Sequence, residues 1–261
     1  MATKFLILNL DDQIFTPMID YIYYKNRGAN AARPGKRKFS LVAPNNVVRQ
    51  LLWVSADDAA RPANDLFDQM LTSNFGEVLV SNTHNNVLAG LGANDQIYIS
   101  VHGQYVGSTD KATNRILLDC AAARGTYDAT AFADFLENTL GLPTNQPLHL
   151  KIFACYSAKG RGDLKALNTT GSYDEQHLKG LVQGSFAGLL KAAMKARYPQ
   201  LTVSGYVGAT RLPSAFGQHK RAFGKGHTGH KSAARDFRIT FDAGSDDPTL
   251  PAGWQNWVTW L

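Results

Sequence analysis

Short apolar runs recur along this chain and constrain its fold more than any other feature. Most are apolar at consecutive positions, as a strand buried on both faces should be. Helical patterns lie between them, and such alternation favours a mostly parallel sheet with helices on both faces. We therefore predict an α/β fold of three layers. Its central six-stranded sheet is expected to contain Lys4–Asn9, Lys38–Ala43, Gln96–Val101, His149–Ala154, Leu201–Val207 and Phe237–Phe241.

Three stretches between these runs are predicted as helices. Asp128–Leu140 begins on a suitable N-cap residue and is followed by Gly141, a residue that often ends helices. Ser185–Tyr198 is closed by a proline, and Pro62–Leu71 has a weaker amphipathic pattern. No internal repeat or low-complexity linker interrupts the 261 residues, so we expect a single domain, residues 1–261.

The composition is that of a folded globular protein, with 44% hydrophobic and 18% charged residues. No apolar run approaches the roughly 18–20 residues that a membrane span needs. Charges follow Lys4–Leu10 at once and no small-residue cleavage site is present, so we interpret this run as a strand rather than a signal peptide. We expect a cytoplasmic protein, or one delivered into a host cell without a signal peptide.

Two of the expected strands run directly into reactive side chains. "IYISVHG" reaches His102 and Gly103, and "KIFACYSA" reaches Cys155. Chemistry in open parallel sheets gathers at the carboxyl ends of the strands, so neighbouring strands would bring these side chains into one crevice. A thiol beside an imidazole is the pair that a cysteine peptidase uses. The main-chain N–H groups of Gly103 and Cys155 would then stabilise the oxyanion.

The alternative for this pair is a core histidine and an inert core cysteine in an α/β binding fold. Two cysteines do not make a disulfide framework, so we expect free thiols, with Cys120 as a small buried residue of the core.

"YISVHG" followed by "KIFACYSA" resembles the catalytic signature of the caspase-like cysteine peptidases, which include caspases, metacaspases, gingipains, separase and the self-processing protease domains of RTX toxins. In that family a His-Gly ends one strand and an Ala/Gly-Cys ends the next. The resemblance covers roughly Leu91–Val207 and implies His102 as the acid–base and Cys155 as the nucleophile. Phe153 stands where metacaspases carry an acid, so we predict no strong preference for Lys or Arg substrates. Substrate binding is assigned to Gly103, Asp163 and Arg211.

Basic residues gather in two acid-poor segments of a chain with a net charge of +6. One is Lys25–Lys38, and the other, which we call the basic flap, is residues 211–236. A solvated charged loop is the plain interpretation of the flap. In the RTX-toxin domains a basic flap binds inositol hexakisphosphate, which switches the enzyme on, and the resemblance extends that expectation to this chain. The predicted phosphate ligands are Arg33, Lys36, Arg37, Lys220, Arg221, Lys225 and Lys231.

Other partners are less favoured by the flap sequence. Nucleic acid would find Phe223 as the only aromatic stacking surface between Gln218 and Ala234. His227 and His230 have no third ligand near in sequence, so we expect no metal. The sequence therefore predicts a cysteine endopeptidase, self-processing or an effector or toxin protease, that inositol hexakisphosphate activates. The rival is a non-catalytic module whose basic face holds nucleic acid or phosphoinositide.

Overall fold

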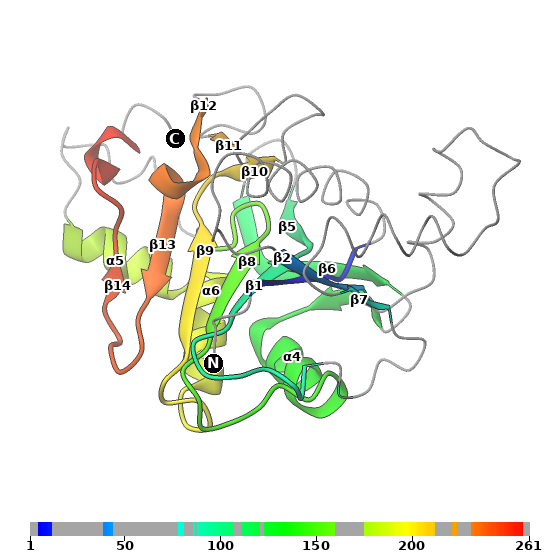
Figure 1. The fold of residues 1–261 in the computed structure, drawn as a ribbon. Coiled ribbons are helices and arrows are strands. Elements are labelled where there is room, and N and C mark those ends of the chain that lie inside the picture. Colours follow the sequence, from blue (N-terminus) through cyan, green and yellow to red (C-terminus); the bar gives the residue numbers. More distant parts are fainter. Residues whose placement is uncertain are drawn as a thin grey trace, which may run out of the picture.

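The computed structural model describes residues 5–11, 39–43, 78–80, 86, 88–106, 111–120, 123–159, 175–211, 221–223 and 231–257. The fold is α/β, with helices packed on a central mixed sheet (Figure 1). Within the described residues, the sheet has eight strands in the order β14-β13-β9-β8-β4-β1-β2-β3. Their bounds are Phe5–Asn9 (β1), Phe39–Ala43 (β2), Val78–Val80 (β3), Gln96–Ser100 (β4), His149–Phe153 (β8), Thr202–Tyr206 (β9), Arg238–Phe241 (β13) and Pro248–Thr249 (β14).

Each of the six expected strands is present in the sheet, within a residue or two at either end. Neighbouring strands pair in parallel along the part of the sheet that contains β3, β2, β1, β4, β8 and β9. The remaining strands, β13 and β14, are antiparallel to their neighbours. The predicted number of six is corrected to eight, because β3 and β14 join the two edges. These strands have three and two residues, too few for a periodic signal in the sequence.

In the part of the chain that the structure describes, two small antiparallel sheets accompany the central one. The first contains β5 (His102–Val106), β6 (Lys111–Cys120) and β7 (Ala123–Tyr127), so His102 begins a new strand beyond the end of β4. The second contains β10 (Ala209–Arg211), β11 (Arg221–Phe223) and β12 (Lys231–Ala233). The basic flap, predicted as a loop, is therefore partly a three-stranded sheet.

Two of the described helices, α4 and α6, begin at side-chain caps. Asp128 accepts a hydrogen bond from Ala131 N at 2.9 Å before α4 (Ala129–Asp134), which continues as a π-helical turn, η3 (Phe135–Thr139). Ser185 caps α6 (Phe186–Met194), which ends one turn earlier than predicted, and α5 (Glu175–Gln183) was not predicted. The predicted helix Pro62–Leu71 lies outside the described residues.

Helix α6 covers the apolar face of the sheet. A Cβ added to Gly205 on β9 would lie 2.9 Å from the Ala187 Cβ of α6. The same face carries Ile97, Ile99, Leu150, Ile152, Val203 and Ile239, which are fully buried. Helix α4 packs beside α6, with the Phe132 and Phe186 rings 5.8 Å apart. Near the C-terminal end of the described residues, Trp257 is fully buried and stacks on Phe237.

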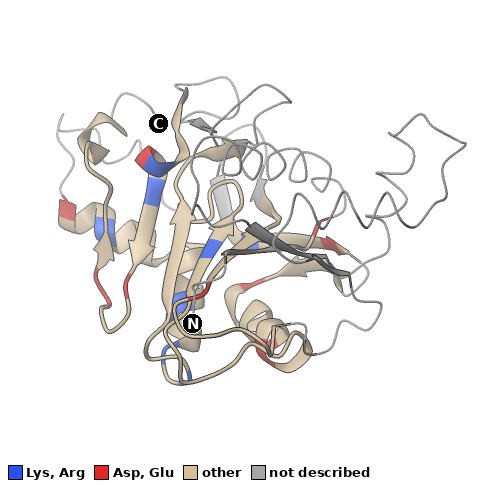
Figure 2. Cartoon of the chain, viewed as in Figure 1, with Lys and Arg blue, Asp and Glu red and all other residues tan. Residues whose placement is uncertain are grey.

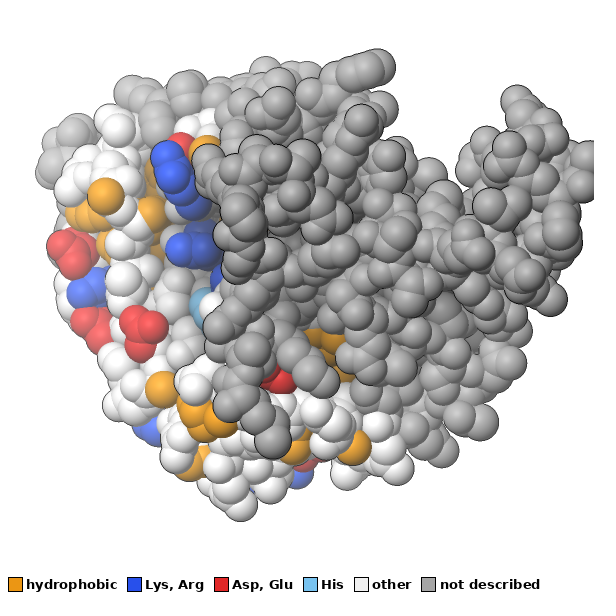
Figure 3. All heavy atoms as spheres, in the orientation of Figure 1, with side chains coloured by type: hydrophobic (Ala, Val, Ile, Leu, Met, Phe, Trp, Pro, Cys, Tyr) orange, Lys and Arg blue, Asp and Glu red, His pale blue; other side chains and the backbone are white. Residues whose placement is uncertain are grey.

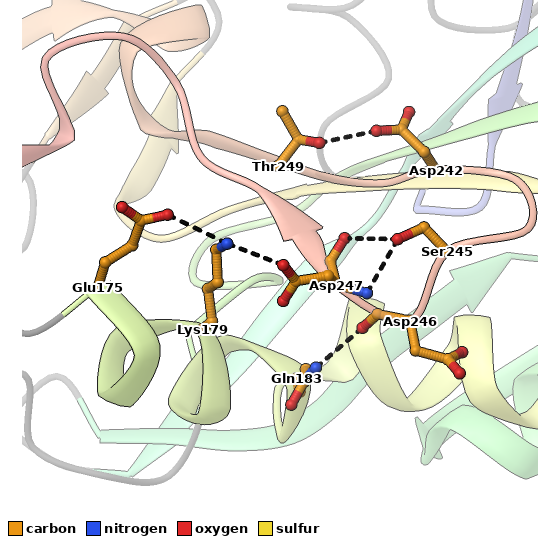
Figure 4. A network of polar contacts seen from close by, with 8 residues as sticks. All are labelled: Glu175, Lys179, Gln183, Asp242, Ser245, Asp246, Asp247 and Thr249. Atoms are coloured by element: carbon orange, nitrogen blue, oxygen red, sulfur yellow. Dashed lines mark hydrogen bonds and ion pairs between the residues drawn. The ribbon is translucent and has the colours of Figure 1, made fainter.

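The turn that leads into the edge strand β14 is joined to α5 by polar contacts (Figure 4). Lys179 Nζ lies 2.8 Å from Asp247 Oδ2 and 3.1 Å from Glu175 Oε1, and Gln183 donates to the Asp246 carbonyl. Exposed ion pairs contribute little to stability, so this network orients the edge more than it stabilises it. Within the described residues, we find no helix with the length and apolar character to cross a membrane.

Candidate active site

The two strands that precede His102 and Cys155 are neighbours in the central sheet. β4 and β8 pair in parallel. Gln96 is the Cα partner of His149 where the pairing begins, and Ser100 is the Cα partner of Phe153 where it ends. Beyond the strands, Val101 N still donates to Phe153 O at 3.5 Å. His102 and Cys155 each follow the last paired residue of their strand by two positions. Both residues therefore lie at the carboxyl ends of the parallel strands, on the same side of the sheet. The predicted adjacency of the two strands is confirmed.

Gly103 brings the main chain after His102 into contact with Cys155. A Cβ added to Gly103 would lie 1.9 Å from the Cys155 carbonyl oxygen and 3.0 Å from its nitrogen. Only glycine permits such a close approach between two backbones. Gly103 therefore has a packing role that sequence reasoning missed, and its role as an oxyanion donor stays a prediction.

Asp11 is a third polar residue at this edge of the sheet. It follows β1, which pairs with β4, and its side chain is 1% exposed. Asp11 Oδ2 accepts a hydrogen bond from His102 Nδ1. This hydrogen bond is the main reason that the pKa of His102 is raised. Burial of the ring lowers the pKa by a smaller amount, and the negative charges of Asp11 and Asp119 raise it further. With Nδ1 bound to Asp11, Nε2 is the ring nitrogen left for proton transfer.

Sequence reasoning missed Asp11, although a signal was present. "FLILNLDD" is another apolar run that ends on ionisable residues, at the carboxyl end of a parallel strand. The rule that selected His102 and Cys155 applies equally to this run. What the sequence lacked was the strand order that places β1 beside β4.

The turn that carries Cys155 is tightly held against β9. Ser157 Oγ donates to Ile152 O and accepts from Tyr206 N, both at 3.0 Å. Tyr156 N donates to Gly208 O at 3.0 Å, and Tyr156 has a positive φ of 57°. A non-glycine residue in this conformation costs roughly 1–3 kcal/mol, and such residues cluster at active sites. The turn therefore presents Cys155 on a strained but rigid support.

The two cysteines have different surroundings, and both are free thiols. Cys120 is 1% exposed at the end of β6, and its Sγ donates to Ala123 O at 3.5 Å, as expected of a buried residue of the core. Cys155 is half-buried, and its Sγ lies 3.5 Å from Thr210 O and 3.9 Å from Thr210 Oγ1. Cys155 is thus the more accessible thiol.

The second face of the sheet is polar and carries basic residues. Strand register places Tyr98, Lys151, Ser204 and Thr240 in one row across β4, β8, β9 and β13. Lys151 is 7% exposed, and its Nζ donates to Gln96 Oε1 at 2.7 Å and to Tyr98 OH at 3.2 Å. Figure 3 shows basic side chains on this face, and Figure 2 shows acidic residues in the turn between β13 and β14.

Burial changes the ionisation of this polar row. It lowers the pKa of Lys151 to about 8, with a smaller contribution from the charge of Arg238. Burial also lowers the pKa of His149 to about 3, followed by the charges of Lys151 and Arg238. His149 is therefore neutral at pH 7, and its Nε2 lies 2.7 Å from Ser204 Oγ. Sequence reasoning missed this cluster because Lys151 lies inside an apolar run.

The described part of the basic flap contains two of the predicted phosphate ligands, Arg221 and Lys231, and also Arg211, which was predicted to bind substrate. Arg211 on β10 pairs with Arg221 on β11, and Lys231 on β12 pairs with Phe223. The other predicted residues lie outside the described part of the chain: Arg33, Lys36, Arg37, Asp163, Lys220 and Lys225. In the described segments, no three His, Cys, Asp or Glu side chains are grouped as metal ligands.

A pocket of about 510 Å³ lies between α5 and the segment from Ser245 to Gln255, and no predicted site residue lines it.

In comparisons with known proteins, no protein-family model and no curated protein sequence matches this chain. Its function must therefore be argued from the residues at the ends of β1, β4 and β8.

Proposed function

We propose that this chain is a cysteine endopeptidase of caspase-like type, with Cys155 as the nucleophile and His102 as the acid–base. The observation that carries the proposal is the hydrogen bond that His102 Nδ1 donates to Asp11, where His102 follows β4 and β4 is the neighbour of the strand that leads to Cys155. A base that is oriented by a third group beside a nucleophile is the arrangement that activates thiols and hydroxyls. A core histidine in a binding module needs no such arrangement.

In the proposed reaction His102 Nε2 takes the Cys155 proton, and the sulfur electron pair attacks the scissile carbonyl carbon. The carbon–nitrogen bond then breaks, and the imidazolium gives its proton to the leaving amine. The product is an acyl thioester on Cys155. His102 next takes a proton from water, the resulting oxygen attacks the thioester, and the carbon–sulfur bond breaks. The proton returns to the sulfur.

The raised pKa of His102 supports the first of these steps. Asp11 stabilises the imidazolium form, so transfer of the thiol proton to Nε2 is less costly than it would be to an isolated histidine. An imidazolium close to a thiol also favours the thiolate, which is the reactive form of cysteine. In this scheme Asp11 is a positioning residue that acts through His102.

The finer part of the proposal is that inositol hexakisphosphate activates the peptidase. The substrate that the active peptidase cleaves would be this chain itself or another protein. It is supported by Arg211, Arg221 and Lys231 in the small flap sheet, and by Arg238, which follows that sheet on β13. Several phosphates can engage several cations by charge-assisted bonds. We expect calorimetry at low salt to detect binding, and Lys220→Ala/Arg221→Ala to weaken activation without changing ligand-independent labelling of Cys155. Absence of binding at micromolar concentration would remove this part.

The catalytic proposal is tested by labelling with peptide acyloxymethyl ketones that differ in the residue before the ketone. We expect one adduct, at Cys155, and the same labelling rate in Cys120→Ala. His102→Ala should slow labelling about 10²-fold or more, because an acid–base group contributes roughly that much. Labelling that is no faster than in the unfolded chain, or unaffected by His102→Ala, would reject the peptidase. Tight binding of nucleic acid or phosphoinositide vesicles would then identify the binding module.

A further inference from the structure

Thr210 contacts the reactive sulfur with two different atoms. It is the middle residue of β10 and is 8% exposed. Its main-chain oxygen lies 3.5 Å from Cys155 Sγ, and its side-chain Oγ1 lies 3.9 Å from the same sulfur. The predicted site did not include Thr210, because 55 residues separate it from Cys155 in the sequence.

These two atoms suit different protonation states of the sulfur. A carbonyl oxygen only accepts hydrogen bonds, so it can hold the thiol S–H but repels a thiolate. A hydroxyl can also donate, and a donor stabilises the charged form of the group that it faces. Thr210 therefore offers an acceptor to the resting thiol and a donor to the thiolate.

The position of Thr210 is set by the same contacts that hold the Cys155 turn. Tyr156 N donates to Gly208 O at 3.0 Å, two residues before Thr210. On its other side, Thr210 is the Cα partner of Ala222 on β11. Main-chain contacts on both sides thus hold the backbone of Thr210 beside the Cys155 turn.

We propose that Thr210 is a further catalytic residue, whose hydroxyl donates a hydrogen bond to the thiolate of Cys155. The assignment rests on the proposed function. When the S–H bond breaks, the proton goes to His102 Nε2 and the electron pair stays on the sulfur. The Thr210 hydroxyl then rotates to donate to that sulfur, and it returns when the thiol is restored.

The test measures the ionisation of Cys155 directly and needs no substrate. In a Cys120→Ala background, alkylation by iodoacetamide is followed by intact-protein mass spectrometry from about pH 5 to 10. Thr210→Val keeps the shape of the side chain without the hydroxyl, and Thr210→Ser keeps the hydroxyl. A full charged hydrogen bond corresponds to about one pH unit or more, and the 3.9 Å separation reduces this. We expect the apparent pKa of Cys155 to rise by about 0.5–1 unit in Thr210→Val, with about 3–10-fold slower alkylation at low pH.

Thr210→Ser should stay close to the parent, and Thr240→Val is the matched control. Thr240 makes a hydroxyl contact of 3.0 Å to Ser204 in the polar row of the central sheet, so the loss of this hydroxyl should leave the titration of Cys155 unchanged. Equal titration curves for Thr210→Val and the parent would overturn the assignment, as would equal shifts in Thr210→Val and Thr210→Ser. The two proposals can fail separately. If the Thr210 variants titrate as expected but no peptide ketone labels Cys155, the peptidase is rejected and the contact between Thr210 and the sulfur stands.

Discussion

Replacing Gly103 by alanine should displace His102 from Cys155 more than it destabilises the fold. The added Cβ would lie 1.9 Å from the Cys155 carbonyl oxygen, whereas ordinary van der Waals contact begins at 3.4 Å. The backbones must therefore separate by about 1.5 Å. The Cys155 turn cannot easily yield, because Ser157 and Tyr156 bind it to β9 and to the segment that follows. We expect the start of β5, which carries His102, to move instead.

The size of the effect follows from these distances. Overpacking costs about 1–3 kcal/mol, which lowers the melting temperature of a domain of this size by about 2–10 °C. A misplacement of about 1 Å between reacting groups can cost about 10²-fold in rate. Gly103→Ala should therefore remain folded at 25 °C while Cys155 is labelled about 10²-fold more slowly by a peptide ketone.

Circular dichroism melting and the labelling rate, measured on the same samples, separate these two effects. Gly90→Ala is the matched control, because a Cβ at that position has no atom within 4 Å. If Gly103→Ala melts and reacts like Gly90→Ala, the two backbones are not in the contact described and the argument for a shared site loses its geometric basis.

Two further changes test the ionisable groups. Asp11→Asn should lower the pKa of His102, which NMR titration measures. The stability that the Asp11–His102 pair contributes is fully present below pH 6.5 and is lost as pH rises through the raised pKa of the folded state. Urea unfolding should therefore show a larger loss of stability in the variant at about pH 5.5 than at about pH 9. An unchanged titration would contradict the role of Asp11. Lys151→Met should be stabilised relative to the parent at pH 7, because the folded pKa of Lys151 is about 8 against 10.5 unfolded; urea unfolding should show this advantage narrowing, by at most about 3 kcal/mol, as pH rises between those values. A constant difference across that range would mean that Lys151 is not charged and buried at neutral pH.

The strands of the sheet were predictable because each has its own local signal. β1 (FLILN) is a mostly apolar run, and β4 (QIYIS) and β8 (HLKIF) alternate apolar residues on the α6 face with mostly polar residues on the other face. The helix caps were equally local, since Asp128 and Ser185 each bond an N–H three residues ahead. His102 and Cys155 were found because a reactive residue directly after an apolar run is visible in the sequence itself.

Pairing between distant segments was not predictable in this way. Asp11 and His102 are 91 residues apart, and their contact depends on β1 lying between β2 and β4. Nothing in the apolar pattern of a strand states which neighbour it takes, because that pattern records burial and not partners. The predicted count of six strands failed for a related reason, since short edge strands such as β14 form where a partner is already in place.

The sequence by itself determined an α/β chain with a histidine and a cysteine at the ends of two buried strands, because burial and strand geometry leave a periodic record in each segment. Only the tertiary structure decided that Asp11 binds His102, that Gly103 lies against the Cys155 backbone, and that Thr210 contacts the sulfur. Each of these contacts joins residues at least 50 positions apart, or depends on the space between two backbones. They follow from strand order and close packing, which involve the whole chain at once.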